Sequence, residues 1–283
     1  MTKTIAIIGA GGQMGKWLSD HFVKKGFEVT GFDTENPIPT NIKKAESLIS
    51  AILNKEYVIL STPTKKTPEI IRLIAKEMRR ESYLIDITSQ KSKTAAALGK
   101  IPAKVCPVCI HPMFGPGAKG VKNQNIISIP IKDGKKELTV AKNLFPDANF
   151  VTIDSNEHDK KIAIILGLTH LINIAFANIL AKYDKILLTE KMAGTTFKAQ
   201  KIIAESILTE SPELIETIIS NPEIRRVAEE FWKDIGRLLT SAQEGNGHEI
   251  VTYINSNKEK LSENIDLEKS YKKLTKMVNT MKN

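Results

Sequence analysis

Two residues that could exchange or hold a proton lie just after stretches that are typical of buried strands. His111 follows Val108-Cys109-Ile110, and Ser89 follows Leu84-Ile85-Asp86-Ile87. An imidazole can take up and release a proton near neutral pH, whereas a hydroxyl both donates and accepts hydrogen bonds. In an open parallel sheet, ligands bind beyond the carboxyl ends of the strands. His111 is therefore a candidate catalytic base, and the alternative is a histidine that only caps a strand end.

A cluster of glycines near the N-terminus favours the catalytic interpretation, because it predicts a cofactor. The glycines follow the apolar run Ile5-Ala6-Ile7-Ile8 and precede a helix-like pattern. Glycine allows a tight turn and a close approach to a ligand, and a helix N-terminus attracts phosphate. The spacing departs from the strict Gly-x-Gly-x-x-Gly fingerprint, and a purely structural turn is the alternative. We predict that a dinucleotide is bound by Gly9, Gly11, Gly12, Gln13, Met14 and Gly15.

The ends of two further apolar runs add to this cofactor site. Asp33 ends the run 27–32, at about the distance where dinucleotide-binding domains place an acid on the adenosine ribose. A carboxylate there accepts hydrogen bonds from the ribose hydroxyls and repels a 2′-phosphate, so we expect NAD rather than NADP. Ser61, Thr62 and Pro63 follow the next apolar run and are expected to line the same cleft.

The elements that must position these residues alternate between strand and helix patterns. Strands are expected at 4–9, 27–32, 56–61, 82–87, 105–110, 125–131 and 149–153. Such alternation predicts an α/β fold with a doubly wound, Rossmann-type parallel sheet. The later strands lie closer together in the sequence, so the far edge of the sheet is expected to be antiparallel. After Ile153 only helical periodicity remains, which predicts an NAD-binding domain over 1–154 and an all-helical substrate-binding and dimerisation domain over 155–283.

The first helix of the second domain, expected at about 156–181, is apolar on nearly every face. Such a helix requires cover on nearly every face, and a short helical domain cannot supply it alone. We therefore expect a homodimer formed through this domain. His158 and His170 lie on this helix about 18 Å apart, so they cannot share a metal ion. A lone histidine such as His170 on an apolar face is usually a core residue with its hydrogen bonds satisfied.

Composition limits the remaining classes of function. The net charge of the 283 residues is +9, and residues 1–154, with 23 Lys and Arg against 14 Asp and Glu, carry all of it. No basic stripe is interleaved with aromatic residues, so we expect anionic small molecules rather than nucleic acid as partners. No apolar run is expected to reach the length of a membrane span, and the early first strand leaves no room for a signal peptide. Cys106 and Cys109 are interpreted as core thiols without a metal, which fits the cytoplasm.

The chain resembles the prephenate dehydrogenase family, which includes arogenate dehydrogenases. The resemblance extends to about residue 240, and His111-Pro112-Met113-Phe114-Gly115-Pro116 is its most specific string. The other matching strings are Gly11-Gly12-Gln13-Met14-Gly15, Ser61-Thr62-Pro63, Asp86-Ile87-Thr88-Ser89-Gln90-Lys91, Glu157-His158-Asp159 and Leu168-Thr169-His170-Leu171. No additional segment for a fused chorismate mutase or regulatory domain is visible.

The resemblance implies NAD-dependent oxidative decarboxylation of prephenate to 4-hydroxyphenylpyruvate, a step of tyrosine biosynthesis. It implies that His111 bonds the ring hydroxyl and draws off its proton while hydride leaves the same carbon. It also implies that Ser89 positions His111 and the hydroxyl, and that His170 helps to hold the substrate. A base, a hydrogen-bonding partner and a nicotinamide are what the oxidation of an alcohol requires.

One departure from the family concerns the substrate carboxylate. Members usually present an arginine to it from the helical domain, but Ser206 lies near that position. A serine cannot make the bidentate charged contact. The candidates to replace the arginine are Lys198, Lys201, Arg225 and Arg226, although each of them, taken alone, is better interpreted as a solvated surface charge.

Three alternatives remain at this point. Arogenate dehydrogenase would bind an amino acid side chain in place of a keto acid. A β-hydroxyacid dehydrogenase also joins this nucleotide-binding fold to a helical domain, but it normally relies on a lysine, which would leave His111 unexplained. A non-catalytic redox sensor that binds NAD is the third; Ser89 and His111 argue against it, and Ser206 leaves it open.

Overall fold

The computed structural model describes residues 2–183 and 191–280. The chain divides into two compact units, residues 1–161 and 162–283. The first unit contains the sheet and the second contains only helices within the described residues. The domain boundary expected between residues 154 and 155 stays a prediction.

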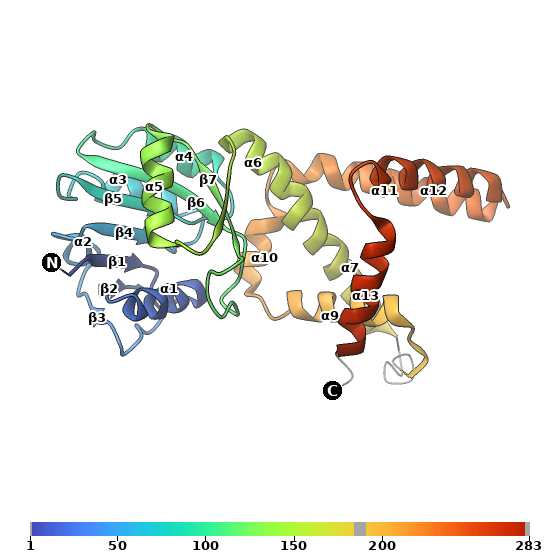
Figure 1. Ribbon diagram of the computed structural model, residues 1–283, viewed down its shortest axis with the longest axis horizontal. Coiled ribbons are helices and arrows are strands. Elements are labelled where there is room, and N and C mark those ends of the chain that lie inside the picture. The colour runs from blue at the N-terminus through green and yellow to red at the C-terminus, as the bar shows by residue number, and fades with distance from the viewer. Residues whose placement is uncertain (1, 184–190, 281–283) are drawn as a thin grey trace. The chain divides into compact units, whose positions relative to one another are not determined.

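The first unit is built from alternating strands and helices (Figure 1). Its strands are β1 (Thr4–Ile8), β2 (Glu28–Phe32), β3 (Lys43–Lys44), β4 (Tyr57–Leu60), β5 (Ser82–Asp86), β6 (Val105–Pro112), β7 (Asn125–Ile129) and β8 (Asn149–Thr152). Its helices are α1 (Gln13–Lys24), α2 (Leu48–Ile52), α3 (Thr67–Ile74), α4 (Ser92–Gly99), α5 (Gly134–Leu144) and α6 (Ser155–Ile162), whose last residue belongs to the second unit.

All eight strands form one sheet in the order β3-β2-β1-β4-β5-β6-β7-β8. Strands β1 to β6 are parallel to one another, and β7 is antiparallel to β6, which confirms the expected antiparallel far edge. The order reverses beside β1, because β2 lies on one side of it and β4 on the other. In a doubly wound sheet, this reversal opens the crevice that accepts a dinucleotide. The predicted fold class is thus confirmed.

Side chains alternate across the sheet and form two apolar cores, one on each face. Ala6, Ile8, Val58 and Leu60 pack with residues of α2, α3 and α4 on one face. On the other face, Ile5, Ile7, Ile59 and Ile85 pack with α1 and α5. Because helices cover both faces, the central strands are apolar in nearly every position.

Two details of the sheet differ from the sequence expectations. The short strand β3 has no apolar alternation, and it forms because Lys43 and Lys44 pair with Thr30 and Gly31. Strand β6 continues through His111 to Pro112 and does not end at residue 110. The antiparallel partner β7 causes this extension, because it places Ile127 opposite His111.

The second unit consists of seven described helical segments (Figure 1). They are η1 (Ala163–Leu168, a π-helix), α7 (Thr169–Lys182), α9 (Thr195–Ile207), α10 (Pro212–Ile219), α11 (Ile224–Gln243), α12 (Gly247–Ser262) and α13 (Leu267–Thr280). Gly167 of η1 permits close packing, since a Cβ atom there would lie 2.2 Å from Cδ1 of Ile224. The small buried core of η1 and α11 contains Ala163, Ile224 and Val227.

The continuous helical stretch Ser155–Lys182 is 28 residues long and, by length and composition alone, could cross a membrane. The expectation that no apolar run reaches that length is therefore wrong by this criterion. Only 28% of its most apolar window is buried within the described chain, although the sequence predicted burial on nearly every face. Ile164 and Ile165 are both at least half exposed. Most of this window is thus exposed within the described residues.

Candidate active site

The glycine turn after β1 has a backbone that only glycine accommodates. Gly9 has a φ of +87°, and a Cβ atom there would lie 2.2 Å from the carbonyl oxygen of Ser61. A Cβ atom on Gly15 would lie 2.0 Å from the carbonyl oxygen of Gly9, so Gly15 lets α1 pack directly against the turn. These two glycines bring strand and helix close together, as the sequence predicted for a dinucleotide-binding turn.

The N-terminus of α1 fits a phosphate. Gly12 is the N-cap residue, and within the described chain no side chain caps the helix and no acidic residue occupies its first turn. A Cβ atom on Gly12 would meet only the carbonyl oxygen of Gly9, at 3.5 Å, so the space before the helix is open. The N–H groups of Gln13, Met14 and Gly15 begin the helix and have no intrahelical acceptor. These residues could hold the pyrophosphate of a dinucleotide.

Asp33 connects the loop after β2 to the glycine turn. Its Oδ2 accepts a hydrogen bond from the N–H of Gly11 at 3.0 Å. Its Oδ1 accepts hydrogen bonds from the N–H groups of Glu35 and Asn36, both at 2.9 Å. A carboxylate has about four lone-pair sites, so it retains capacity for a ribose hydroxyl. The carboxylate therefore has a structural role in addition to the ribose contact predicted from the sequence.

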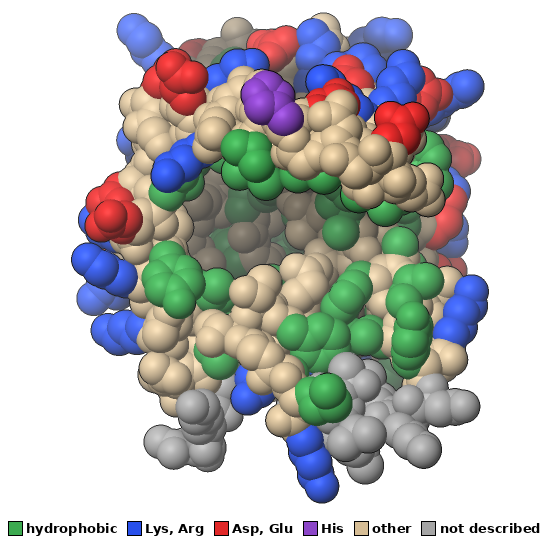
Figure 2. All heavy atoms as spheres, turned by 90° about the vertical axis from the view of Figure 1, so that its right-hand side faces the viewer, with side chains coloured by type: hydrophobic (Ala, Val, Ile, Leu, Met, Phe, Trp, Pro, Cys, Tyr) green, Lys and Arg blue, Asp and Glu red, His purple; other side chains and the backbone are tan. Residues whose placement is uncertain are grey.

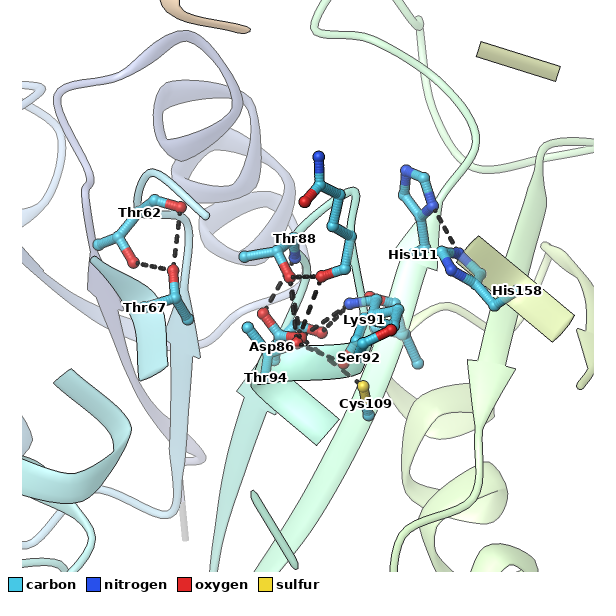
Figure 3. A network of polar contacts seen from close by, with 12 residues as sticks. Thr62, Thr67, Asp86, Thr88, Lys91, Ser92, Thr94, Cys109, His111 and His158 are labelled. Carbon is cyan, nitrogen blue, oxygen red and sulfur yellow. Dashed lines mark hydrogen bonds and ion pairs between the residues drawn. The ribbon is translucent and has the colours of Figure 1, made fainter. Parts of the chain in front are cut away.

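The segment after β4 lies beside the same turn. The N–H of Ser61 donates to the carbonyl oxygen of Ile8 at 2.8 Å, which holds the end of β4 against β1. The hydroxyls of Thr62 and Thr67 are 2.8 Å apart (Figure 3), and the Thr67 hydroxyl donates to the carbonyl oxygen of Pro63. The structure thus places these three predicted cofactor residues next to the glycine turn.

His111 lies in β6 and pairs with a second histidine from the start of the long helical stretch. Its Nδ1 atom is 3.0 Å from Nε2 of His158 in α6, and a dashed line joins the two rings in Figure 3. The His158 Nδ1 atom lies 2.8 Å from Oδ1 of Asp159. All three residues are buried. They form a hydrogen-bonded series from β6 to a carboxylate.

Asp159 is held by the N-terminus of α4. Its Oδ1 accepts from the N–H of Lys91 at 2.8 Å, and its Oδ2 accepts from the N–H of Ser92 at 2.9 Å and from the Ser92 hydroxyl. Burial alone would raise the pKa of Asp159, but hydrogen bonds from His158, Ser92 and the α4 backbone lower it to about 2. Asp159 is therefore a carboxylate at neutral pH.

A buried ion pair lies beside this histidine pair. The Lys91 ammonium is fully buried and lies 2.8 Å from Oδ2 of Asp86. It also donates to the carbonyl oxygen of Ile110 at 2.6 Å. Because its donors are directed to Asp86 and the β6 backbone, Lys91 fixes the strand next to His111. Its charge disfavours a second positive charge nearby.

The two paired histidines are neutral at pH 7. Burial, followed by the Lys91 ammonium and His158, lowers the pKa of His111 well below its ordinary value. Burial also lowers the pKa of His158, although its hydrogen bond to Asp159 acts in the opposite direction. A neutral imidazole has one nitrogen that can accept a proton. His111 can therefore serve as a base.

Ser89 is less directly connected to His111 than the resemblance implied. It follows β5, the parallel neighbour of β6, so both residues lie toward the same edge of the sheet. Among the described residues, no hydrogen bond joins Ser89 to His111, and His158 takes the Nδ1 side of the ring. A positioning role for Ser89 stays a prediction.

His170 lies in the helical unit in a different electrostatic environment. Its Nδ1 atom is 2.7 Å from the carbonyl oxygen of Leu166, in the π-helix, and its Nε2 atom is 3.3 Å from Oε2 of Glu210. Both partners are acceptors, so both nitrogens must carry hydrogen. The hydrogen bond to Glu210 raises the pKa of His170 against the effect of burial. The contacts of His170 thus favour its protonated form more than those of His111 and His158 do.

The cations proposed to replace the family arginine lie on helices of the same unit. Lys201 pairs with Glu205, and Arg225 pairs with Glu229 at 2.9 Å, each one helical turn apart. Arg226 pairs in the same way with Glu230, at 2.8 Å. Lys198 is exposed. Ser206 donates to the carbonyl oxygen of Ile203 at 2.8 Å. A role of these residues in substrate binding stays a prediction.

Sequence reasoning missed His158 and Asp159 as members of the candidate site. The sequence places His158 47 residues after His111, and no spacing rule connects the two. The available signal was the adjacent pair His158-Asp159 at a predicted helix start, within a string that matched the family. An acid next to a histidine commonly orients its ring.

Two family models match this chain. Residues 33–163 match the family model of the prephenate dehydrogenase nucleotide-binding domain, and residues 154–256 match that of the prephenate dehydrogenase dimerization domain. A protein of Methanocaldococcus jannaschii named as a probable arogenate/prephenate dehydrogenase is 29% identical over 243 residues, 81% of this chain. The chain spans about half, 54%, of the length of that relative.

Two solved structures have a similar fold. Prephenate dehydrogenase from A. aeolicus, in complex with hydroxyphenyl propionate and NAD+, superposes with a TM-score of 0.71 at 20% identity, over 93% of this chain and 98% of that one. Synechocystis arogenate dehydrogenase superposes with a TM-score of 0.65 at 14% identity, over 91% and 99% of the two chains. The first family model describes a nucleotide-binding domain, and the A. aeolicus structure is a complex with NAD+. Together the two matched domains extend from residue 33 to residue 256, and the chain belongs to the prephenate dehydrogenase family.

Proposed function

We propose that this chain is an NAD-dependent oxidoreductase that converts prephenate to 4-hydroxyphenylpyruvate and carbon dioxide in tyrosine biosynthesis. The observation that carries the proposal is His111, which is buried and neutral. It lies on the same sheet as the nucleotide-binding turn, which follows β1 where the strand order reverses. NAD, when bound, supplies the acceptor for the hydride. The chain must then bind the substrate, orient its hydroxyl and accept a proton.

His111 would accept the hydrogen bond of the ring hydroxyl and take its proton as the carbon that bears it is oxidised. When the carboxylate leaves as carbon dioxide, its bonding electrons enter the ring, and the ring oxygen recovers the proton from His111. Ser89 would bond the same hydroxyl from the loop after β5. General-base assistance of this kind typically contributes about 10²–10⁴-fold to the rate.

The cofactor would be held by the turn at Gly9, Gly11 and Gly12, by the start of α1 and by Asp33. The segment Ser61–Pro63 would complete this site. The support for these roles is the steric demand for glycine at the turn, the uncapped helix N-terminus and the carboxylate of Asp33 beside Gly11.

The substrate is dianionic, and the helical unit supplies candidate cations for it. Its hydrogen bond to Glu210 favours the protonated form of His170, and a substrate carboxylate would have to compete with Glu210 for the Nε2–H group. Lys198, Lys201 and Arg225 are further candidates, and a carboxylate would have to compete with Glu205 and Glu229 for the last two. Arogenate is the alternative substrate, because the relatives include both kinds of dehydrogenase.

The helical unit is also proposed to form a homodimer. The second family model describes a dimerization domain, and the unit exposes large apolar residues that include Ile164, Ile165 and Trp232. Figure 2 shows hydrophobic side chains gathered around a hollow on the face that this unit presents. A second copy is favoured over a membrane as the cover, because buried His170 and Asn173 interrupt the apolar stretch. We propose a cytoplasmic enzyme.

The experiment that tests this function follows NADH absorbance with prephenate and with arogenate, each with NAD and with NADP. We expect turnover with prephenate and NAD. Faster turnover with arogenate would assign the chain to the alternative substrate. Binding of NAD without turnover of either substrate would reject the enzyme and favour a redox sensor.

A further inference from the structure

We propose that His158 is a positioning residue that fixes the tautomer of His111, with hydrogen on Nδ1 and a bare lone pair on Nε2. Its place in catalysis rests on the proposed function, in which His111 is the base. The tautomer itself is a property of the first unit alone.

The series begins at Asp159, whose two oxygens are anchored by the backbone at the start of α4 and by Ser92. A carboxylate only accepts hydrogen bonds, so Nδ1 of His158, 2.8 Å away, must be the donor. A neutral imidazole has only one N–H, and Nε2 of His158 is therefore an acceptor. Nδ1 of His111, 3.0 Å from that atom, must then donate.

The opposite arrangement would require a charged His158 that donates from both nitrogens. Such a charge would lie in a buried environment beside the Lys91 ammonium, which already pairs with Asp86. Burial and Lys91 both lower the pKa of His158. His158 is therefore neutral. A neutral His158 is compatible only with the tautomer of His111 that carries hydrogen on Nδ1 and leaves the Nε2 lone pair for the substrate hydroxyl.

The same contacts stabilise the protonated state that forms during reaction. When Nε2 of His111 takes the hydroxyl proton, His111 carries hydrogen on both nitrogens and a positive charge. Its Nδ1–H remains bonded to His158, and the carboxylate of Asp159 faces the far side of His158. The proton on Nε2 returns to the ring oxygen when carbon dioxide leaves, so His158 never changes its protonation.

Two substitutions at position 158 separate positioning from packing. His158→Leu removes the acceptor, whereas His158→Gln retains an oxygen that can accept from Nδ1 of His111. Asp159 is left unchanged because its contacts with Lys91 and Ser92 hold α4. The tautomer is read from the ¹⁵N resonances of histidine-labelled protein without substrate, with His111→Asn to assign the signals.

We expect hydrogen on Nδ1 of His111 in the unaltered protein and in His158→Gln, and loss of this preference in His158→Leu. We also expect kcat of His158→Leu to fall roughly 10²–10⁴-fold, the range for removing the group that orients a catalytic histidine. KM and the dissociation constant of NAD should not change, and His158→Gln should recover most of kcat.

Hydrogen on Nε2 of His111 in the unaltered protein would overturn the proposal, as would unchanged kcat in a folded His158→Leu variant. A His158→Leu variant that loses activity but keeps the Nδ1 tautomer would also overturn it. If the unaltered protein turns over neither prephenate nor arogenate, the proposed function fails, and the resonances still decide the tautomer.

Discussion

Nδ1 of His111 lies 3.0 Å from Nε2 of His158, and this contact joins the sheet to the start of the long helical stretch. We predict that His111→Asn lowers kcat by about 10²–10⁴-fold, because asparagine is not a base at neutral pH. NAD affinity should stay unchanged. Steady-state kinetics and NAD titration measure the two effects, and His248→Asn, on an exposed histidine, is the control. An equal loss of NAD binding would contradict the assigned role.

Replacement of glycine by alanine should have different effects at Gly9 and at Gly12 of the glycine turn. Gly9→Ala should cost at least about 1–2 kcal/mol of folding stability, since its φ is +87° and the new Cβ would clash with Ser61. Gly12→Ala has ordinary space and a negative φ, so it should keep its stability but bind NAD more weakly. Chemical denaturation and NAD titration compare the pair. Equal stability of the two variants would show that the turn tolerates a side chain at Gly9.

Asp33→Ala should lower the preference for NAD over NADP roughly tenfold, which corresponds to about 1.4 kcal/mol. The carboxylate no longer repels a 2′-phosphate, and the Gly11 N–H loses its acceptor. The measurement is the ratio of kcat/KM for the two cofactors. Glu35→Ala removes the same charge from an exposed neighbour that pairs with Lys66. A similar change in both variants would indicate a general charge effect.

The pair of His170 and Glu210 predicts a stability difference that depends on pH. Because the hydrogen bond to Glu210 raises the pKa of His170 above its unfolded value, the pair stabilises the fold below about pH 6.5. This contribution is lost as the pH rises through the folded pKa. Glu210→Gln should therefore lower the free energy of unfolding more at pH 6 than at pH 9.

The size of that difference is a few tenths to about 1 kcal/mol, because the Glu210 side chain is about one-third exposed at 35%. Denaturant unfolding at the two pH values measures it. Glu213→Gln, on an exposed residue of the neighbouring helix α10, is the control. A larger loss at the higher pH would contradict a charged His170.

Ile164 and Ile165, 53% and 50% exposed in η1, test the proposed dimer. Substitution of both by lysine should convert a dimer to a monomer, because each buried isoleucine contributes about 1.5–3 kcal/mol to an interface. Sedimentation measures the assembly, and circular dichroism checks that the helices are retained. Leu53→Lys, at a residue 49% exposed in the first unit, is the control. A dimer that survives both lysines would place the interface elsewhere.

Much of the fold could be predicted from local patterns. Apolar runs and the helices between them predicted seven of the strands, because burial on both faces leaves a continuous apolar run. The strand β3 could not be predicted, since its two lysines pair through the backbone and carry no side-chain pattern. The extent of β6 also depended on its neighbour, because β7 determines where pairing ends.

The sequence by itself determined the glycine turn, because the backbone conformation at Gly9 and the packing at Gly15 depend on residue type within a few positions. It also identified His111 as a group able to exchange a proton. Only the tertiary structure decided which groups surround that histidine. His158 and Asp159 meet His111 and α4 across separations of 47 and 68 residues. Hydrogen-bond partners and burial, which set the charge of a histidine, are properties of atoms brought together by folding, and no local spacing encodes them.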